Sequence, residues 1–371
     1  MKRLGLGLFA LLGPVLFAQQ QVPEISYYSV PDLLKLPKDM NLGETSGVAV
    51  NSKGHIFVFT RSNSANGPAY GAAAAQLFEC DADGKFIREI AKGLYAWSFA
   101  HTVRVDKDDN IWAVDKGSNM VVRLNADGHV TMVFGRKTEA LEREEPHKPG
   151  GPPPRVLDGM FNQPTDIAWN AAGDMFVSDG YVNSRVAKYD RNGAWVKSWG
   201  EPGQGPGQFK LPHGIAVDAQ GQVYVADRAN ARIQVFDSDG NFLRQIVIDV
   251  PVPPGTRPLM GYQAPPPADA PPGTNLSYRP GAPGAFCITP PPNQVMYVAD
   301  LYPTRIYKLS LDGKVLGMFG KNGRQLGEFG GMHQMVCPSE YVIYVAELLN
   351  WRVQKLILQP AARSSPSATN R

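Results

Sequence analysis

The stretch LPHGIAVDAQGQVYVADRANARIQVFDSDGNF, residues Leu211–Phe242, contains three short apolar runs, Ile215–Val217, Val223–Ala226 and Ile233–Phe236, separated by turn residues. Runs of β-branched and aromatic residues bounded by Asp and Gly are typical of strands joined by tight turns. Residues 242–246 supply a fourth strand. Because a four-stranded unit that returns along a chain is typical of a propeller blade, this stretch predicts one blade of a β-propeller.

The same pattern occurs six times in the 371 residues. The first two strands of the successive copies are 47–50 and 56–60, 102–106 and 111–114, 166–169 and 175–178, 215–217 and 223–226, 286–289 and 296–299, and 334–337 and 342–346. The last copy lacks an outer strand, whereas residues 25–30 offer a spare one. Pairing the two closes the ring without an unpaired sheet edge. The sequence therefore predicts an all-β, six-bladed propeller whose N-terminal strand closes the last blade.

The chain begins with Lys2 and Arg3, followed by an apolar run over residues 4–17 and by Ala18. This pattern predicts a cleaved signal peptide over residues 1–18 and a secreted or periplasmic protein. The run is too short, and too broken by Gly and Pro, for a membrane anchor. We expect a leader with the closing strand over 19–41, the propeller over 42–359 and a disordered polar tail over 360–371.

The composition is that of a globular protein, with 43% hydrophobic and 19% charged residues and a net charge of +3. Lys and Arg are scattered, which argues against nucleic acid as a partner. A closed ring has no need of a second copy, so we expect a monomer. Cys287 and Cys337 lie in apolar runs and are most simply buried hydrophobic residues, although one disulfide among these and Cys80 stays open.

The long connections between copies should crowd one face of the ring, because strand directions alternate. They span residues 136–160, 200–212, 249–284 and 321–331. The segment 251–283 is very rich in proline, and we interpret it as a stiff loop that acts as a lid.

An acid followed by Asn and Arg comes after the second strand of several copies: Asp227, Asn230 and Arg232, with equivalents at 179, 183 and 185 and at 347, 350 and 352. We interpret these sets as structural, with the carboxylate bonding a turn and pairing with an Arg between blades.

Three of the six histidines share one position at the start of the first strand, in alternate copies. These are His101, His213 and His333, and the intervening copies carry Ser46, Thr165 and Ala285 there. One such His is most often a surface or capping residue. Alternate blades of six are a third of a turn apart, however, so three imidazoles should converge on the channel, as in a catalytic zinc site with one open position. The other three, at 55, 129 and 147, lie in turns or a loop and should be solvated.

Two further residues break the repeat on the same face. Arg61 stands where most copies carry an acid, and Tyr181 lies in a turn that is one residue longer than its equivalents. A Tyr near an Arg and a dication loses its proton more easily than a free phenol, because both charges favour the phenolate. Taken singly, each residue is equally well explained by packing.

Together these five positions resemble peptidyl-α-hydroxyglycine α-amidating lyase, a family of NHL-repeat six-bladed propellers. The matching motifs are FAHTV at 99–103, LPHG at 211–214, GMHQ at 331–334, DGYVNSR at 179–185 and VFTR at 58–61. The resemblance implies that the three His bind zinc and that Tyr181 and Arg61 complete the site. The implied reaction cleaves the C–N bond of a carbinolamide, a peptide or small molecule with an α-hydroxyglycine end, into an amide and glyoxylate.

The resemblance also implies a role for each group. Zinc would polarise the hydroxyl or carboxylate of the substrate. Tyr181, as phenolate, would take the hydroxyl proton. Arg61 would lower the pKa of the Tyr or neutralise the anionic end of the substrate.

The sequence departs from the family at a second metal site. The family holds a structural calcium with two backbone carbonyls, matched by Val48 and Val103, and with a carboxylate after the third His, where this chain has Gln334. An amide oxygen can bind calcium but lacks the charge. The two disulfides of the family are missing too, since Asn162, Val182, Tyr224 and Val235 stand at those places.

Two other classes of function stay open: a non-catalytic propeller that binds a protein or cell-wall ligand, and a calcium-dependent lactonase or esterase on a similar ring. A pure scaffold has no need of convergent His, Tyr and Arg. A calcium hydrolase would need several acidic or amide side chains near the axis, where this chain has His, Ser, Thr and Ala.

Overall fold

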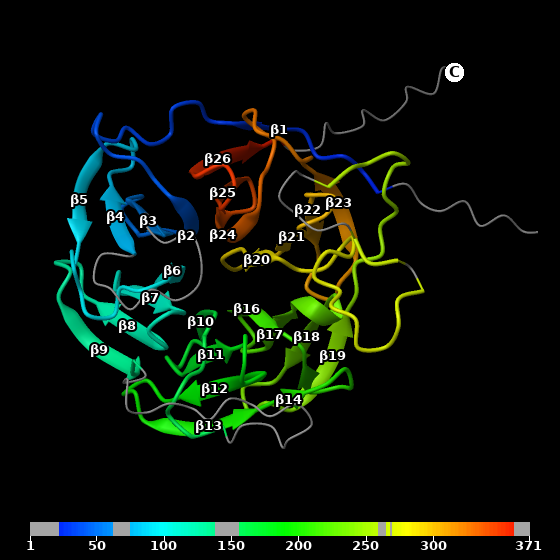
Figure 1. The fold of residues 1–371 in the computed structure, drawn as a ribbon, viewed down its shortest axis with the longest axis horizontal. Helices are drawn as coiled ribbons and strands as arrows, with labels where there is room; N and C mark the ends of the chain where they lie inside the picture. Colours follow the sequence, from blue (N-terminus) through cyan, green and yellow to red (C-terminus); the bar gives the residue numbers. More distant parts are fainter. Residues whose placement is uncertain (1–21, 62–74, 138–155, 259–264, 268, 360–371) are drawn as a thin grey trace, which may run out of the picture.

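The computed structural model of the chain describes residues 22–61, 75–137, 156–258, 265–267 and 269–359. They form six four-stranded antiparallel sheets around a central axis (Figure 1). The predicted all-β, six-bladed propeller is confirmed. The expected signal peptide over 1–18, the tail over 360–371 and His147 lie outside the described residues.

Each sheet is one blade, and its first strand in the following order is the innermost one. Blade 1 is β2 (Glu44–Val50), β3 (Ile56–Arg61), β4 (Gln76–Cys80) and β5 (Phe86–Ile90); blade 2 is β6 (Ala100–Val105), β7 (Ile111–Asp115), β8 (Met120–Leu124) and β9 (Val130–Gly135); blade 3 is β10 (Asp166–Trp169), β11 (Met175–Asp179), β12 (Arg185–Tyr189) and β13 (Trp195–Trp199). Blade 4 is β16 (Pro212–Val217), β17 (Val223–Asp227), β18 (Arg232–Phe236) and β19 (Phe242–Ile246); blade 5 is β20 (Ala285–Ile288), β21 (Met296–Ala299), β22 (Ile306–Leu309) and β23 (Val315–Phe319); blade 6 is β24 (Met332–Ser339), β25 (Val342–Glu347), β26 (Arg352–Leu358) and β1 (Tyr27–Ser29).

The N-terminal strand closes the ring as the sequence predicts. β1 pairs antiparallel with β26, in a register that places Tyr28 opposite Ile357. Just before it, the N–H of Ile25 donates to the carbonyl of Met318 at 2.9 Å. The leader therefore joins the outer strand of blade 5 to blade 6 as well as completing blade 6.

The blades are held together by apolar faces on both sides of each sheet. In β17, Val223 and Val225 pack toward blade 3, whereas Tyr224 and Ala226 pack toward blade 5. This alternation follows from the two-residue period of a strand. Within the described residues, six such clusters fill the six contacts between neighbouring blades. Burial on both faces explains why the second strands read as continuous apolar runs.

Two expectations about single residues need correction. Cys287 and Cys337 are buried, but they form a disulfide with a Cα–Cα distance of 6.0 Å between β20 and β24, in neighbouring blades. Cys80 stays a free thiol, and its burial raises the pKa to about 11. His55 is not simply solvated, since its Nδ1 lies 2.8 Å from Glu79 Oε1.

The sets of acid, Asn and Arg are structural groups. Asp227 Oδ2 accepts hydrogen bonds from Asn230 at 2.7 Å and from Arg232 Nε at 2.9 Å. The ion pair lies within one blade rather than between blades, because β17 and β18 are paired strands. Arg232 reaches the preceding connection instead, through the carbonyls of Gly205 and Gln208.

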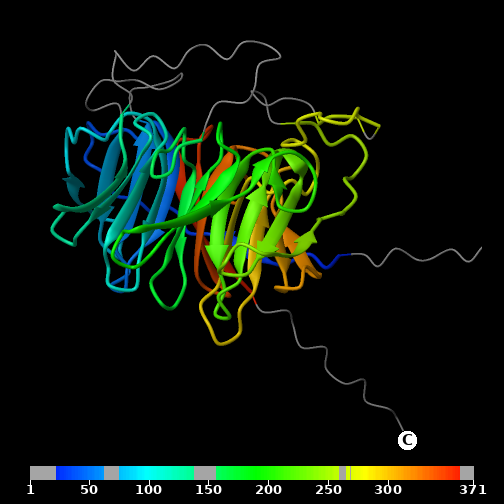
Figure 2. The ribbon, with the colours of Figure 1, turned by 90° about the horizontal axis from the view of Figure 1, so that it is seen from below.

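The described part of the proline-rich connection lies on one face of the disc, as Figure 2 shows in yellow. Its Leu276 N–H donates to the carbonyl of Ala229 at 2.9 Å, in the short helix η1 (Arg228–Asn230) that follows β17. Residues 259–264 and 268 of this connection lie outside the described residues. In the described part of the chain, no helix has both the length and the apolarity needed to cross a membrane.

Candidate metal centre

A β-bulge lies at each of the three axial histidines. His101, His213 and His333 are each the second residue of an innermost strand, β6, β16 and β24, rather than residues just before it. The pairing with the second strand shifts register across each of them. A bulge places an extra residue in one strand and redirects its side chain. This local irregularity turns three imidazoles toward the axis.

The three rings lie against one another, with centroid distances of 4.9 Å between His101 and His213, 4.5 Å between His101 and His333, and 5.1 Å between His213 and His333. One nitrogen of each ring lies within 4.8 Å of the other two. All three side chains are buried. Among the described residues, this is the one cluster of three or more His, Cys, Asp or Glu side chains with the spacing of a metal site.

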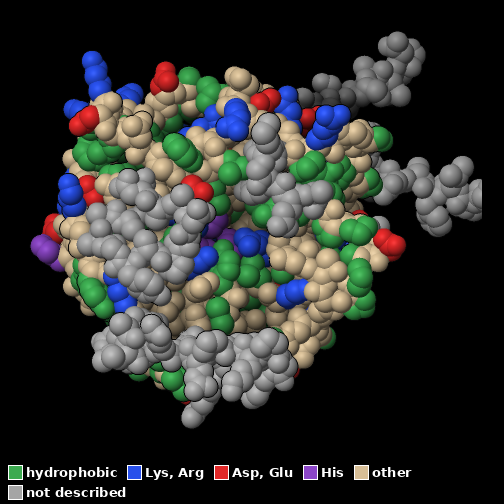
Figure 3. All heavy atoms as spheres, in the orientation of Figure 1, with side chains coloured by type: hydrophobic (Ala, Val, Ile, Leu, Met, Phe, Trp, Pro, Cys, Tyr) green, Lys and Arg blue, Asp and Glu red, His purple; other side chains and the backbone are tan. Residues whose placement is uncertain are grey.

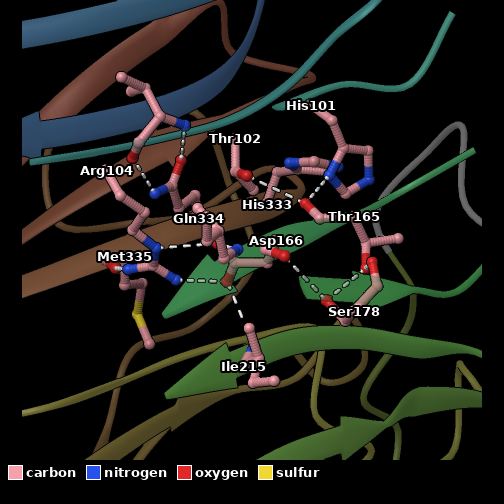
Figure 4. A network of polar contacts seen from close by, with 12 residues as sticks. His101, Thr102, Arg104, Thr165, Asp166, Ser178, Ile215, His333, Gln334 and Met335 are labelled. Atoms are coloured by element: carbon pink, nitrogen blue, oxygen red, sulfur yellow. Dashed lines mark hydrogen bonds and ion pairs between the residues drawn. The ribbon is translucent and has the colours of Figure 1, made fainter. Parts of the chain in front are cut away.

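Backbone carbonyls of the intervening blades orient two of the rings (Figure 4). His101 Nδ1 lies 2.6 Å from the carbonyl oxygen of Thr165, and His333 Nδ1 lies 2.7 Å from that of Ser46. A carbonyl oxygen only accepts, so Nδ1 carries the proton in each ring. Nε2 then keeps its lone pair for a ligand, which is the usual arrangement of a metal-binding His.

The third ring points to the same conclusion. His213 Nε2 is buried and has no hydrogen-bond partner among the described residues. Such an orphaned nitrogen is costly unless something binds it. Burial lowers the pKa of all three His well below the usual range, and neighbouring imidazoles and cations add to the effect. The rings are therefore neutral at pH 7, as metal ligands must be, and these residues fit a metal ion.

The longer turn of blade 3 brings Tyr181 to this centre. Its hydroxyl lies 3.3 Å from His101 Nε2, and its ring centroid lies 6.0 Å from that of His213. A Cβ at the preceding residue, Gly180, would lie 1.8 Å from the carbonyl oxygen of Pro212. Only glycine lets the turn approach β16 this closely.

Arg61 also reaches the centre, from the end of β3. Its Nη2 lies 3.4 Å from His333 Nε2, while its Nε donates to the carbonyl of Ala100 at 2.8 Å. Its Nη1 pairs with Glu44 at 3.1 Å, and its guanidinium lies 4.1 Å from the Phe99 ring centroid. The structure thus brings together all five residues that the motifs single out.

Two cations at the site are missed by the sequence analysis. Lys116 Nζ lies 3.9 Å from the Tyr181 ring centroid, and Arg228 forms a side-chain hydrogen bond with Tyr181. Burial alone would raise the pKa of Tyr181, but the charges of Arg228, Lys116 and Arg61 outweigh burial and lower it. Figure 3 shows histidine and basic side chains together in the hollow at the centre of this face.

A signal for these cations is present in the sequence. Lys116 and Arg228 each follow directly after the conserved position of the repeat's acid, Asp115 in blade 2 and Asp227 in blade 4. Blades 3, 5 and 6 carry Gly180, Leu301 and Leu348 there. The cations therefore occur in two of the blades that supply a His, and alignment of the copies at this position would reveal them.

The three residues matched to a calcium site also lie together, but their arrangement does not fit the ion. Gln334 Nε2 donates a hydrogen bond to the Val103 carbonyl oxygen at 2.5 Å. That oxygen was expected to be a calcium ligand, and it faces an N–H donor instead. Calcium takes oxygen ligands.

Comparison with known proteins supports the resemblance. The NHL repeat family matches residues 209–236, which cover most of blade 4. The chain is 31% identical over 265 residues to peptidyl-glycine α-amidating monooxygenase A of Xenopus laevis, across 61% of this chain and 26% of that protein. It is 25% identical over 353 residues to peptidyl-α-hydroxyglycine α-amidating lyase 1 of Drosophila melanogaster, across 88% of this chain and 59% of that protein.

A third relative has a similar name. A probable peptidyl-α-hydroxyglycine α-amidating lyase of Caenorhabditis elegans is 30% identical over 217 residues, across 53% of this chain and 56% of that protein. The chain thus spans about a quarter of the length of the monooxygenase and a little over half of the length of the two lyases.

Among solved structures, a streptogramin B lyase has a TM-score of 0.53 at 13% identity and covers 90% of this chain and 97% of its own. At that identity the likeness concerns the fold alone. The sequence relatives go further, and the resemblance carried by the five motifs is confirmed: this chain is an NHL-repeat propeller related to proteins named peptidyl-α-hydroxyglycine α-amidating lyases.

Proposed function

We propose that this protein is an exported, zinc-dependent lyase that cleaves the C–N bond of an α-hydroxyglycine-type carbinolamide to give an amide and glyoxylate. The observation that carries the proposal is the meeting of three neutral imidazoles with a Tyr hydroxyl 3.3 Å from one of them. The named lyases among the sequence relatives support the reaction class. A peptide with an α-hydroxyglycine end is the substrate class that those names suggest.

His101, His213 and His333 would hold the zinc ion. Three imidazole nitrogens that leave a coordination position open are the ligand set of a catalytic zinc site. When bound, zinc supplies a Lewis acid that polarises a hydroxyl or carboxylate oxygen of the substrate.

The cations around the site would bind the carboxylate of the substrate. Lys116, Arg228 and Arg61 all act on Tyr181 electrostatically, so they surround the same small volume. Burial lowers the pKa of both Arg61 and Lys116, which indicates that their charges are poorly solvated. A carboxylate entering this volume would offset that cost. An acid that leaves as glyoxylate meets this requirement.

Tyr181 would act as the base. As a phenolate, favoured by Arg228 and Lys116, it would accept the proton of the substrate hydroxyl. The electron pair of that O–H bond becomes the new C=O bond while the C–N bond breaks. The departing amide nitrogen then takes up the proton that Tyr181 received, so the reaction consumes no net proton.

Metal analysis tests the centre. We expect one zinc ion per chain in the purified wild-type protein and its loss in His213→Ala, because two imidazoles bind zinc much more weakly than three. His129→Ala is the matched control, since His129 is an exposed turn residue and its loss should leave the zinc content unchanged. Zinc retained by His213→Ala, or calcium as the sole metal of the wild-type protein, would contradict the proposal.

Glyoxylate release from an α-hydroxyglycine substrate tests the base. Tyr181→Phe should lower kcat by at least about 10²-fold, the usual contribution of a general base, while zinc remains bound. The control is Tyr189→Phe in the same blade, whose buried hydroxyl has no hydrogen-bond partner among the described residues. Unchanged turnover in Tyr181→Phe would refute this role.

Substrate analogues test the carboxylate pocket. In Arg228→Met, KM for the α-hydroxyglycine acid should rise about 10- to 100-fold, as expected for the loss of a charged hydrogen bond. An analogue whose carboxylate is converted to an amide should bind the variant and the wild-type protein equally well. Equal losses for both compounds would show that Arg228 does not recognise the carboxylate.

Export is the remaining component of the proposal. The Cys287–Cys337 disulfide supports it, because disulfides persist in oxidising compartments. N-terminal sequencing of the mature protein should begin close after Ala18, and an intact Met1 on the active protein would count against export.

A further inference from the structure

The side chain of Gln334 connects three blades at the axis. It is 2% exposed and extends from β24 of blade 6. Its Oε1 accepts hydrogen bonds from the Val48 N–H of blade 1 at 3.2 Å and from the Val103 N–H of blade 2 at 3.0 Å. Its Nε2 donates to the Val103 carbonyl at 2.5 Å. Figure 4 shows this amide beside the backbone between Thr102 and Arg104.

The orientation of the amide follows from the partners it meets. Val103 presents both its N–H and its C=O to the axis, and the amide answers each with the complementary group, as the peptide of a neighbouring strand would. Turning the amide over would place its NH₂ against two N–H donors and its oxygen against a carbonyl. The network therefore assigns oxygen and nitrogen without ambiguity.

A neighbouring glycine leaves room for this contact. A Cβ at Gly47, in the bulge of β2, would lie 2.8 Å from Gln334 Oε1 and 2.9 Å from the Val103 nitrogen. Any larger residue would push the amide and β6 apart. A second contact joins the same two blades, since Arg104 Nη1 of β6 donates to the Met335 carbonyl of β24 at 3.2 Å.

We propose that the Gln334 amide replaces a structural calcium ion in this chain and clamps blades 1, 2 and 6 together without a second metal. A cation binds carbonyl oxygens, and it would need the Val103 oxygen that the amide N–H already occupies. An amide also brings no negative charge to offset that of the ion. The clamp satisfies both the donors and the acceptor, which a single ion cannot do.

The clamp also positions the metal centre. Gln334 follows His333 directly, and Val103 lies two residues after His101. Ser46, whose carbonyl orients His333, lies two residues before Val48. Each of the three bonds of the clamp therefore anchors a strand close to a ligand or to a group that orients one. Gln334 is thus a positioning residue for His101 and His333.

Thermal unfolding and calorimetry with calcium chloride test the proposal. The wild-type protein should have the same midpoint with and without millimolar calcium, and calorimetry should detect no saturable calcium binding. Gln334→Glu cannot donate to the Val103 oxygen and places a carboxylate beside it, so its midpoint should fall by several degrees without calcium and recover when calcium is added. Gln334→Met, which matches Gln in length, should have a lowered midpoint that calcium does not restore.

Zinc affinity provides a readout that a purely structural role elsewhere would not move. Gln334→Met should bind zinc about 10- to 100-fold more weakly, as when a group that orients metal ligands is lost. A wild-type midpoint that rises saturably with calcium would overturn the proposal, even if neither variant folds. So would a Gln334→Met protein with wild-type stability and zinc affinity. None of these measurements depends on lyase activity.

Discussion

The free inner edge of each blade is the constraint on which the rest of this structure depends. An innermost strand has a partner on one side only, and its other backbone groups face a closed channel. Buried backbone groups must find hydrogen bonds. Here the Thr165 and Ser46 carbonyls accept from His101 and His333, and Gln334 serves two blades. The bonds that satisfy the axis are therefore the bonds that orient the metal-binding rings.

The charge of the site arises where the repeat is altered. The repeat places a buried carboxylate at the end of the second strand, as Asp227 illustrates, and blade 1 has Arg61 in that place. Lys116 and Arg228 follow the acid in two further blades. Three cations beside neutral imidazoles are unfavourable without an anion. The same charges lower the pKa of Tyr181 against the effect of burial, so one electrostatic arrangement serves both anion binding and proton transfer.

Much of the fold could be predicted from the sequence because its signals are local and repeated. The apolar runs of blade 4 and the spare strand at residues 25–30 were enough to predict six blades and the closure by β1. The outer strands of blade 1, β4 and β5, were not assigned, because residues 62–90 lack a clear repeat of the pattern. The Cys287–Cys337 disulfide stayed undecided, since pairing depends on the distance between two blades.

By itself, the sequence determined the number of blades and the alternation of His101, His213 and His333, because a repeat with a fixed period converts position in the chain into angle around an axis. Only the tertiary structure decided where those side chains point and what surrounds them. The bulges depend on strand register. The contact of Tyr181 with Arg228 joins blades 3 and 4, and the Gln334 clamp joins three blades. Such contacts exist only once the ring has closed, and no local pattern encodes them.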